Sequence, residues 1–123
     1  MKFELIHPRA GAALSAYDFG PADQLVAFAH ADLGLEIHIT ELDIALDSGD
    51  PSGLATQGDL YRKIAVICLQ NPNCRVLQTW GFTDKYSWLP GYSKGKQGWA
   101  LPFDAAYRRK PAYDRLRNAL QSK

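Results

Sequence analysis

The sequence predicts an α/β fold in which three strand–helix units follow one another and the strands run parallel. The alternation of two sequence patterns leads to this prediction. Short runs of β-branched and apolar residues alternate along the 123-residue chain with longer segments whose apolar residues recur at helical spacing. Strands that alternate with helices favour parallel pairing through right-handed crossovers. In such folds the functional side chains gather at the C-terminal ends of the strands.

Local signals set the limits of each expected element. His7-Pro8 ends the first strand, because the residue before a proline avoids helical backbone. Pro21 suits the first turn of a helix, and Gly34 is typical of a helix end. We expect strands at 2–6, 35–44 and 75–80, helices at 21–31, 56–69 and 111–120, and loops at 8–19, 45–53 and 81–99. The buried stripe of the second helix is expected at Leu60, Ile64, Ile67 and Cys68, and that of the third at Tyr113, Leu116 and Leu120.

Composition excludes several classes of function. The formal net charge is +1, so the chain has no basic field for nucleic acid. It contains no apolar run long enough to cross a membrane, and its first residues lack the apolar stretch of a signal peptide. The three histidines, His7, His30 and His38, lack the spacing of a metal site, so we expect neither a metal nor another cofactor.

Two acidic residues mark the end of the second expected strand. Glu41 and Asp43 are two positions apart, so regular alternation would place them on one strand face. Buried carboxylates need partners, so the pair indicates either a functional site or an edge strand with two solvated acids. His38, three positions before Glu41, should then point to the opposite face and be structural.

The two cysteines also leave two interpretations open. Cys68 ends the second expected helix, and Cys74 begins the third expected strand after an Asn-Pro-Asn turn. They are either two reduced, partly buried thiols or a short-loop disulfide, and the turn brings a disulfide within reach.

Two segments resemble family 10 glycoside hydrolases, the endo-β-1,4-xylanases. Ile39-Thr-Glu-Leu-Asp-Ile44 resembles the nucleophile strand of that family. The segment Cys74-Arg-Val-Leu-Gln-Thr-Trp-Gly-Phe-Thr-Asp-Lys-Tyr-Ser-Trp-Leu-Pro90 resembles its last barrel strand and the following loop. They stand in the family's order, with a helical segment between them. The resemblance therefore implies part of a TIM barrel.

The resemblance also implies roles for individual residues. Glu41 would be the nucleophile of a retaining endo-1,4-β-xylanase, and Asp43 would support a histidine that partners that nucleophile in the family. Lys2, Trp80 and Trp88 would bind xylan or xylo-oligosaccharides. A cysteine pair at a similar place occurs in some family members, which favours a Cys68–Cys74 disulfide and an extracellular or periplasmic location.

The family's second catalytic carboxylate has no match in this sequence. The family takes its acid/base glutamate from an Asn-Glu pair, and the chain contains none. The histidine that Asp43 would support is also missing. Glu4 and His7 are weak replacements, since Glu4 is more simply a solvated strand-end acid. We therefore expect weak or no hydrolysis by the chain alone. The alternatives are a non-catalytic xylan-binding remnant and an inactive barrel fragment that oligomerises.

The matching segments come from separate parts of the family's barrel. Residues 1–34 resemble barrel unit 2 and residues 35–123 resemble units 7 and 8, which describes one truncated partial-barrel domain with an internal deletion. Three parallel strands leave two unpaired sheet edges. The sequence therefore predicts self-association into a homo-oligomer.

Overall fold

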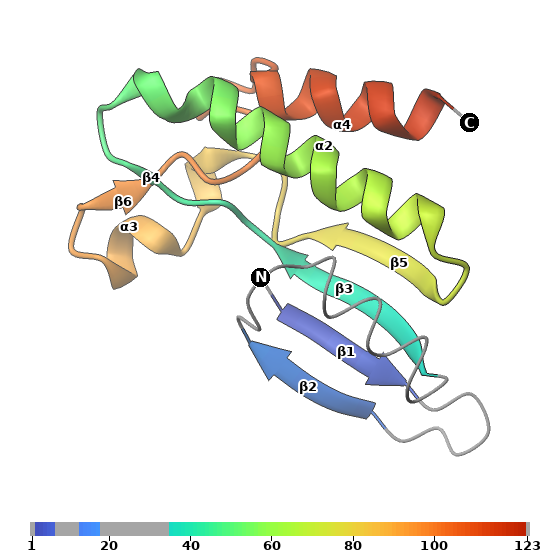
Figure 1. Cartoon of the computed structure of the whole chain (residues 1–123). Coiled ribbons are helices and arrows are strands. Elements are labelled where there is room, and N and C mark those ends of the chain that lie inside the picture. Colours follow the sequence, from blue (N-terminus) through green and yellow to red (C-terminus); the bar gives the residue numbers. More distant parts are fainter. Residues whose placement is uncertain (1, 7–12, 18–34, 123) are drawn as a thin grey trace. The chain divides into compact units, whose positions relative to one another are not determined.

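The computed structural model describes residues 2–6, 13–17 and 35–122, with side chains from residue 35 onward (Figure 1). The chain forms two compact units, which are described separately. The first contains the described residues up to Leu42 together with Ile64–Gln78, and the second contains Asp43–Lys63 and the chain from Thr79 onward. The helix expected at 21–31 lies outside the described residues. Within the described part, no helix has the length and apolar character needed to cross a membrane.

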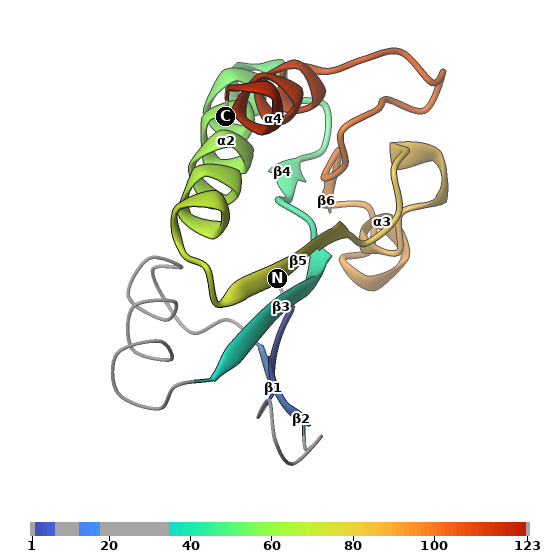
Figure 2. The same cartoon turned by 90° about the vertical axis from the view of Figure 1, so that its right-hand side faces the viewer.

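The first unit is built on a four-stranded sheet with the order β2-β1-β3-β5. Its strands are β1 (Lys2–Ile6), β2 (Ala13–Tyr17), β3 (Glu36–Leu42) and β5 (Cys74–Thr79). The two views in Figures 1 and 2 show β3 and β5 side by side and pointing the same way. The chain between them forms helix α2 (Leu54–Gln70). This β3–α2–β5 unit confirms the predicted strand–helix–strand order and its parallel pairing.

The first strand differs from the prediction. β1 runs antiparallel to both β2 and β3, whereas we expected all three predicted strands to be parallel. The reason is β2, which occupies Ala13–Tyr17 in a segment predicted to be a loop. An antiparallel partner needs only a short connection, whereas a parallel one needs a long crossover. Residues 7–12 are enough to join β1 to β2 in this way.

The buried side of α2 starts from polar residues. Gln57 and Tyr61 are fully buried, and Leu60, expected on this stripe, is exposed. The stripe continues through Ile64, Ala65 and Cys68, as helical spacing requires. At the start of the helix the prediction placed Leu60 on the buried stripe, where the structure has the neighbouring Tyr61, because the prediction considered apolar residues only. The burial of Gln57 and Tyr61 is offset by hydrogen bonds that the Gln57 amide nitrogen and the Tyr61 hydroxyl donate, as described below.

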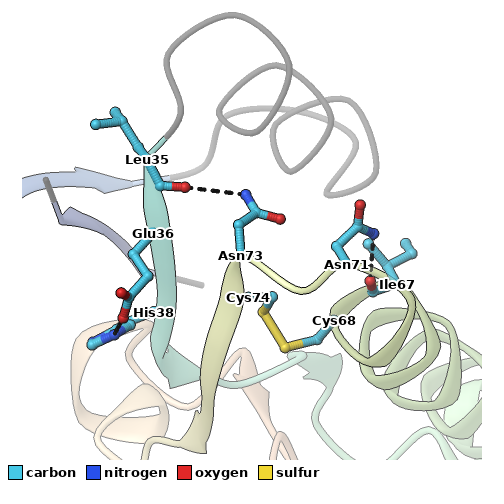
Figure 3. Close-up of a disulfide and its surroundings, with 8 residues drawn as sticks. All are labelled: Leu35, Glu36, His38, Ile67, Cys68, Asn71, Asn73 and Cys74. Atoms are coloured by element: carbon cyan, nitrogen blue, oxygen red, sulfur yellow. Dashed lines mark hydrogen bonds and ion pairs between the residues drawn. A yellow bond between two sulfur atoms is a disulfide. The ribbon is translucent and has the colours of Figure 1, made fainter. Parts of the chain in front are cut away.

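A disulfide joins the end of α2 to the start of β5, as predicted. Cys68 and Cys74 are bonded, with their Cα atoms 5.1 Å apart. Figure 3 shows the turn that they close, in which the Asn71 side-chain amide donates to the carbonyl of Ile67 at 2.7 Å. The Asn73 side chain donates to the carbonyl of Leu35 at 3.2 Å. The Asn73 carbonyl accepts from the backbone N–H of Ile37 at 2.8 Å. The bridged turn is thus tied directly to the start of β3.

The second unit consists of short elements around the first half of α2. They are β4 (Leu46–Asp47), the 3₁₀ turn η2 (Pro51–Gly53), the 3₁₀ turn η3 (Asp84–Tyr86), α3 (Leu89–Tyr92), β6 (Gln97–Gly98) and α4 (Pro111–Gln121). β4 and β6 pair antiparallel as a separate two-stranded sheet. Helix α4 begins at the predicted Pro111 and ends one residue after the predicted limit, and Arg115 on it pairs with Asp59 on α2. Leu120, predicted to face inward, is exposed, and the buried residues of α4 are Ala112 and Ala119.

A buried ion pair organises the loops of this unit. The Lys110 ammonium lies 2.9 Å from Oδ2 of Asp84, and these side chains are 6% and 5% exposed. The other oxygen of Asp84 accepts from the backbone N–H of Leu101 at 2.8 Å. Lys110 also donates to the carbonyl of Trp99. Burial lowers the pKa of Lys110, and the neighbouring Asp84 opposes that shift.

Two side chains of α2 bind the same loop. Gln57 donates to the carbonyls of Ile44 at 2.7 Å and of Trp99 at 2.6 Å. The Tyr61 hydroxyl donates to the carbonyl of Ala100 at 2.7 Å. Burial raises the pKa of Tyr61, and the negative charges of Asp43 and Asp84 add to that rise. Residues 99–101 are therefore fixed by donors from α2 and Lys110 and by Asp84, which accepts from the backbone N–H of Leu101.

We expect the disulfide to contribute measurably to stability. Replacing both Cys68 and Cys74 by serine should lower the free energy of unfolding by about 2–3 kcal/mol, because the open loop gives the unfolded chain more freedom. Chemical denaturation of the two proteins measures this difference. A reductant should destabilise the wild type and leave the double-serine variant unchanged. Equal stability of the oxidised wild type and the variant would contradict the prediction.

We expect Asp84 to depend on Lys110 for its burial. Lys110→Met should lower the free energy of unfolding by about 3–5 kcal/mol, because it leaves a buried carboxylate without its cation. Adding Asp84→Asn should restore part of that loss, since the amide is neutral and its oxygen can still accept from the N–H of Leu101. Denaturant titration of the single and double variants tests this. A double variant less stable than Lys110→Met would show that the carboxylate is not the source of the loss.

Candidate active site

β3 contains a bulge near its C-terminal end. Its register places Ile39 opposite Phe3 but Glu41 opposite Lys2, so β3 takes two residue steps where β1 takes one. The burial pattern breaks at the same point, with buried side chains at Ile37, Ile39 and Leu42. An extra residue in a strand switches the face to which the following side chains point. Glu41 therefore lies on the half-buried face of β3 and not on the face of Ile37 and Ile39.

The bulge changes the relation between Glu41 and His38. Regular alternation predicted opposite faces, but the burial pattern places Glu36, His38 and Glu41 together on the half-buried face. That part of the prediction is wrong, because alternation assumes an unbroken strand. Nε2 of His38 lies 3.1 Å from Oε1 of Glu36, and Figure 3 shows the two side chains side by side on β3. His38 is thus paired with Glu36, the first residue of β3.

Lys2 is aligned with Glu41 on the neighbouring strand. The two Cα atoms are register partners of β1 and β3. The side chain of Lys2 lies outside the described residues, so its role as a substrate-binding lysine stays a prediction. Glu4 aligns with His38, farther from the C-terminal end of β3, and His7 lies outside the described residues.

Asp43 has a partner other than the one that the sequence suggested. It follows the last residue of β3, so strand alternation does not govern its direction. Its Oδ2 accepts a hydrogen bond from the indole Nε1 of Trp88 at 2.8 Å. The ring of Tyr92 lies against Trp88, with 4.9 Å between centroids and 54° between planes. Asp43, Trp88 and Tyr92 form what we call the Trp88 cluster.

The second predicted sugar-binding tryptophan is also accessible. Trp80 directly follows β5 and is 47% exposed, close to the 46% of Trp88. Tyr92 is 76% exposed. Tyr92 was not predicted as a site residue, although its position four residues after Trp88 places both on one side of a helical turn and is a usable signal. These exposed rings offer flat apolar faces together with polar edges.

A separate cavity of about 490 Å³ lies elsewhere in the second unit. Its lining includes Pro51, Leu54, Trp99, Ala105 and Arg109. Glu41, Trp80 and Trp88 are not among its lining residues, so the cavity does not coincide with the predicted site. Among the described residues, no group of three histidine, cysteine or acidic side chains is arranged to hold a metal ion.

Comparison with known proteins identifies the family. The model of glycosyl hydrolase family 10 matches residues 30–119. Endo-1,4-beta-xylanase B of Thermotoga neapolitana is 50% identical over 95 residues, which cover 76% of this chain and 27% of that enzyme. Endo-1,4-beta-xylanase D of Talaromyces funiculosus is 44% identical over 91 residues, covering 73% of this chain and 22% of the relative.

Solved structures agree with these relatives. Xylanase 10B from Thermotoga maritima superposes with a TM-score of 0.73 at 42% identity, covering 83% of this chain and 32% of that one. The family 10 endo-beta-1,4-xylanase of Gloeophyllum trabeum gives 0.75 at 34% identity, covering 81% and 31%. Xylanase 10B from Thermotoga petrophila, solved with xylobiose, gives 0.71 at 45% identity, covering 81% and 30%.

These comparisons confirm the predicted α/β partial-barrel class. The chain spans about a quarter of the length of the curated relatives that it matches. The family model covers nearly three quarters of the chain, including β3, α2, β5 and most of α4. The chain belongs to glycosyl hydrolase family 10.

Proposed function

We propose that this chain carries the nucleophile strand and the sugar-binding aromatic loop of a retaining endo-1,4-β-xylanase. The observation that carries the proposal is Glu41, which stands at the C-terminal end of β3, directed by the bulge, inside the segment that matches the family. Carboxylates at this end of a strand are where barrel enzymes place their catalytic groups. We further propose that residues 1–34 correspond to barrel unit 2 and residues 35–123 to units 7 and 8.

In this proposal Glu41 forms the covalent intermediate. A carboxylate oxygen of Glu41 attacks the anomeric carbon, and the bond from that carbon to the glycosidic oxygen breaks. The leaving oxygen takes a proton from a general acid. Water then gives a proton to the conjugate base of that acid, attacks the same carbon and releases the carboxylate of Glu41. A retaining enzyme places its two carboxyl groups about 5–5.5 Å apart.

The general acid determines which substrates the chain can cleave. The sequence contains no Asn-Glu pair, so the family's acid/base residue has no counterpart at a matching position. Loss of general acid catalysis typically slows a reaction about 10²–10⁴-fold. Cleavage of xylan requires protonation of its leaving oxygen. The leaving group of an activated aryl glycoside departs as a stable phenolate and needs no proton. We therefore propose weak or absent hydrolysis of xylan and measurable attack on aryl xylosides.

Trp80 and Trp88 are proposed to bind the sugar rings of xylan or xylo-oligosaccharides, with Lys2 as a further substrate contact. Their exposure supports this role, because an accessible indole can stack on the C–H face of a pyranose. The Thermotoga petrophila relative was solved with xylobiose, which supports the same class of ligand here. The disulfide supports an oxidising compartment, outside the cell or in the periplasm.

A second candidate function is carbohydrate binding without turnover. Two observations favour it. The rings of Trp80, Trp88 and Tyr92 are exposed, and the sequence lacks the Asn-Glu pair that supplies the family's acid/base residue. Binding needs the aromatic faces but not the second carboxyl group. Calorimetry with xylohexaose distinguishes the two functions when combined with the labelling experiment below, since heat of binding without covalent labelling would favour the binding role.

We expect an activated 2-fluoro-xylobioside with a dinitrophenyl leaving group to label Glu41. The leaving group requires no proton, and the fluorine slows hydrolysis of the intermediate, so the sugar stays attached to the nucleophile. Mass spectrometry of the digested protein should find the added disaccharide on the peptide that contains Glu41. Glu41→Gln should prevent labelling. Glu36→Gln, on the same face of β3, is the matched control and should label like the wild type. A label on another residue would contradict the proposal that Glu41 is the nucleophile.

We also expect the chain to self-associate. Among the described strands, β5 is at one end of the sheet, and an end strand offers unpaired backbone groups to another chain. Light scattering coupled to size exclusion should give a mass that is a multiple of 13.7 kDa. A single species at the monomer mass over a wide concentration range would count against self-association while leaving the Glu41 proposal untouched.

A further inference from the structure

The hydrogen bond between Asp43 and Trp88 connects residues 45 positions apart in the chain. The donor is the indole Nε1 of Trp88, and the acceptor is Oδ2 of Asp43, at 2.8 Å. Both residues belong to the second unit, so the contact lies within one compact body. A hydrogen bond to a carboxylate is stronger than one between neutral groups. It therefore has enough strength to hold a side chain that is otherwise accessible to solvent.

Among the described residues, little else fixes the indole of Trp88. The residue precedes α3, forms no side-chain cap of that helix, and has nearly half of its surface exposed. Its backbone is anchored through the next residue, Leu89, which is buried. The ring contacts Tyr92, which is itself highly exposed. An exposed side chain with two rotatable bonds samples several rotamers, and ordering it on binding costs affinity.

We infer that Asp43 is a positioning residue that holds Trp88 in one orientation before a sugar binds. This inference rests on the proposed function, in which Trp88 contacts the substrate. It assigns Asp43 a role that does not need the histidine found in the family. The carboxylate acts on the substrate only through the indole that it orients.

The same hydrogen bond narrows what Trp88 can recognise. An indole has a single N–H donor, and in Trp88 it is taken by Asp43. Trp88 therefore contacts its ligand through the faces of the ring and not by donating to a sugar hydroxyl. Apolar ring faces select the C–H surface of a pyranose ring. The ligand class that fits is a neutral xylo-oligosaccharide, stacked on Trp88 and hydrogen-bonded by other groups.

The first test observes the indole directly. In a ¹⁵N-labelled protein the three tryptophans give three indole N–H signals, and Trp88→Phe identifies the signal of Trp88. Asp43→Ala should move that signal toward the position of a solvent-exposed indole and leave those of Trp80 and Trp99 in place. Asp43→Asn keeps an oxygen acceptor and should preserve most of the wild-type position. Asp47→Ala, which removes an exposed acid on β4, is the matched control and should change nothing.

The second test measures affinity for xylohexaose by calorimetry. Asp43→Ala should weaken binding about three- to tenfold, the range expected when a side chain must be ordered on binding. Asp43→Asn should bind within about twofold of the wild type, because it keeps an acceptor for the indole N–H. In a Trp88→Phe background, Asp43→Ala should have no further effect, since phenylalanine has no N–H for Asp43 to hold.

Two results would overturn the inference. One is an unchanged Trp88 indole signal in Asp43→Ala. The other is a loss of affinity on Asp43→Ala that is as large in the Trp88→Phe background as in the wild type, which would indicate a role of Asp43 independent of the indole. If no variant and no wild-type protein binds xylohexaose, the proposed function fails, and the indole signals still decide whether Asp43 positions Trp88.

Discussion

The second unit depends on the carbonyl oxygen of Trp99. It accepts hydrogen bonds from Gln57 on α2 and from Lys110 at the start of α4. Trp99 has a φ of 49°, a left-handed backbone conformation that costs a non-glycine residue roughly 1–3 kcal/mol. Two buried donors offset that cost. Because Lys110 also holds Asp84, the same network fixes η3, the turn that leads to Trp88. The buried Lys110–Asp84 pair thus fixes a turn that stands two residues before the exposed Trp88.

The first unit has a comparable constraint in the bulge of β3. One extra residue near Thr40 switches Glu41 from the face of the buried isoleucines to the half-buried face. A carboxylate on the buried face would need compensating donors or would lose its charge. The half-buried face leaves the side chain of Glu41 partly accessible to solvent. The bulge therefore keeps the Glu41 side chain off the apolar face of β3.

The sequence predicted the elements that depend on local pattern. Helices α2 and α4 and strands β3 and β5 lie within a few residues of their expected limits, since periodicity and turn residues define them. It did not predict features set by distant partners. Gln57 and Tyr61 are buried because carbonyls of Ile44, Trp99 and Ala100 accept from them, and hydropathy gives no sign of this. The sequence did not predict the bulge either, because the alternation of side chains cannot reveal an extra residue in a strand. Asp43 and Trp88 were each singled out as site residues, but nothing local indicates a bond across 45 positions.

Glycoside hydrolysis with two carboxyl groups consists of steps that need different residues. Forming the glycosyl intermediate requires a nucleophile and a bound sugar, whereas departure of an alcohol requires a proton donor as well. Glu41, Trp80 and Trp88, for which we propose a role on the substrate, would all serve the first step. Asp43 would have had no purpose here as a histidine support, because that histidine has no counterpart in the sequence. The proposed positioning of Trp88 through its hydrogen bond to Asp43 would give Asp43 a role in the first step instead. The proposed function is therefore tested more sharply by sugar binding and covalent labelling than by turnover of xylan.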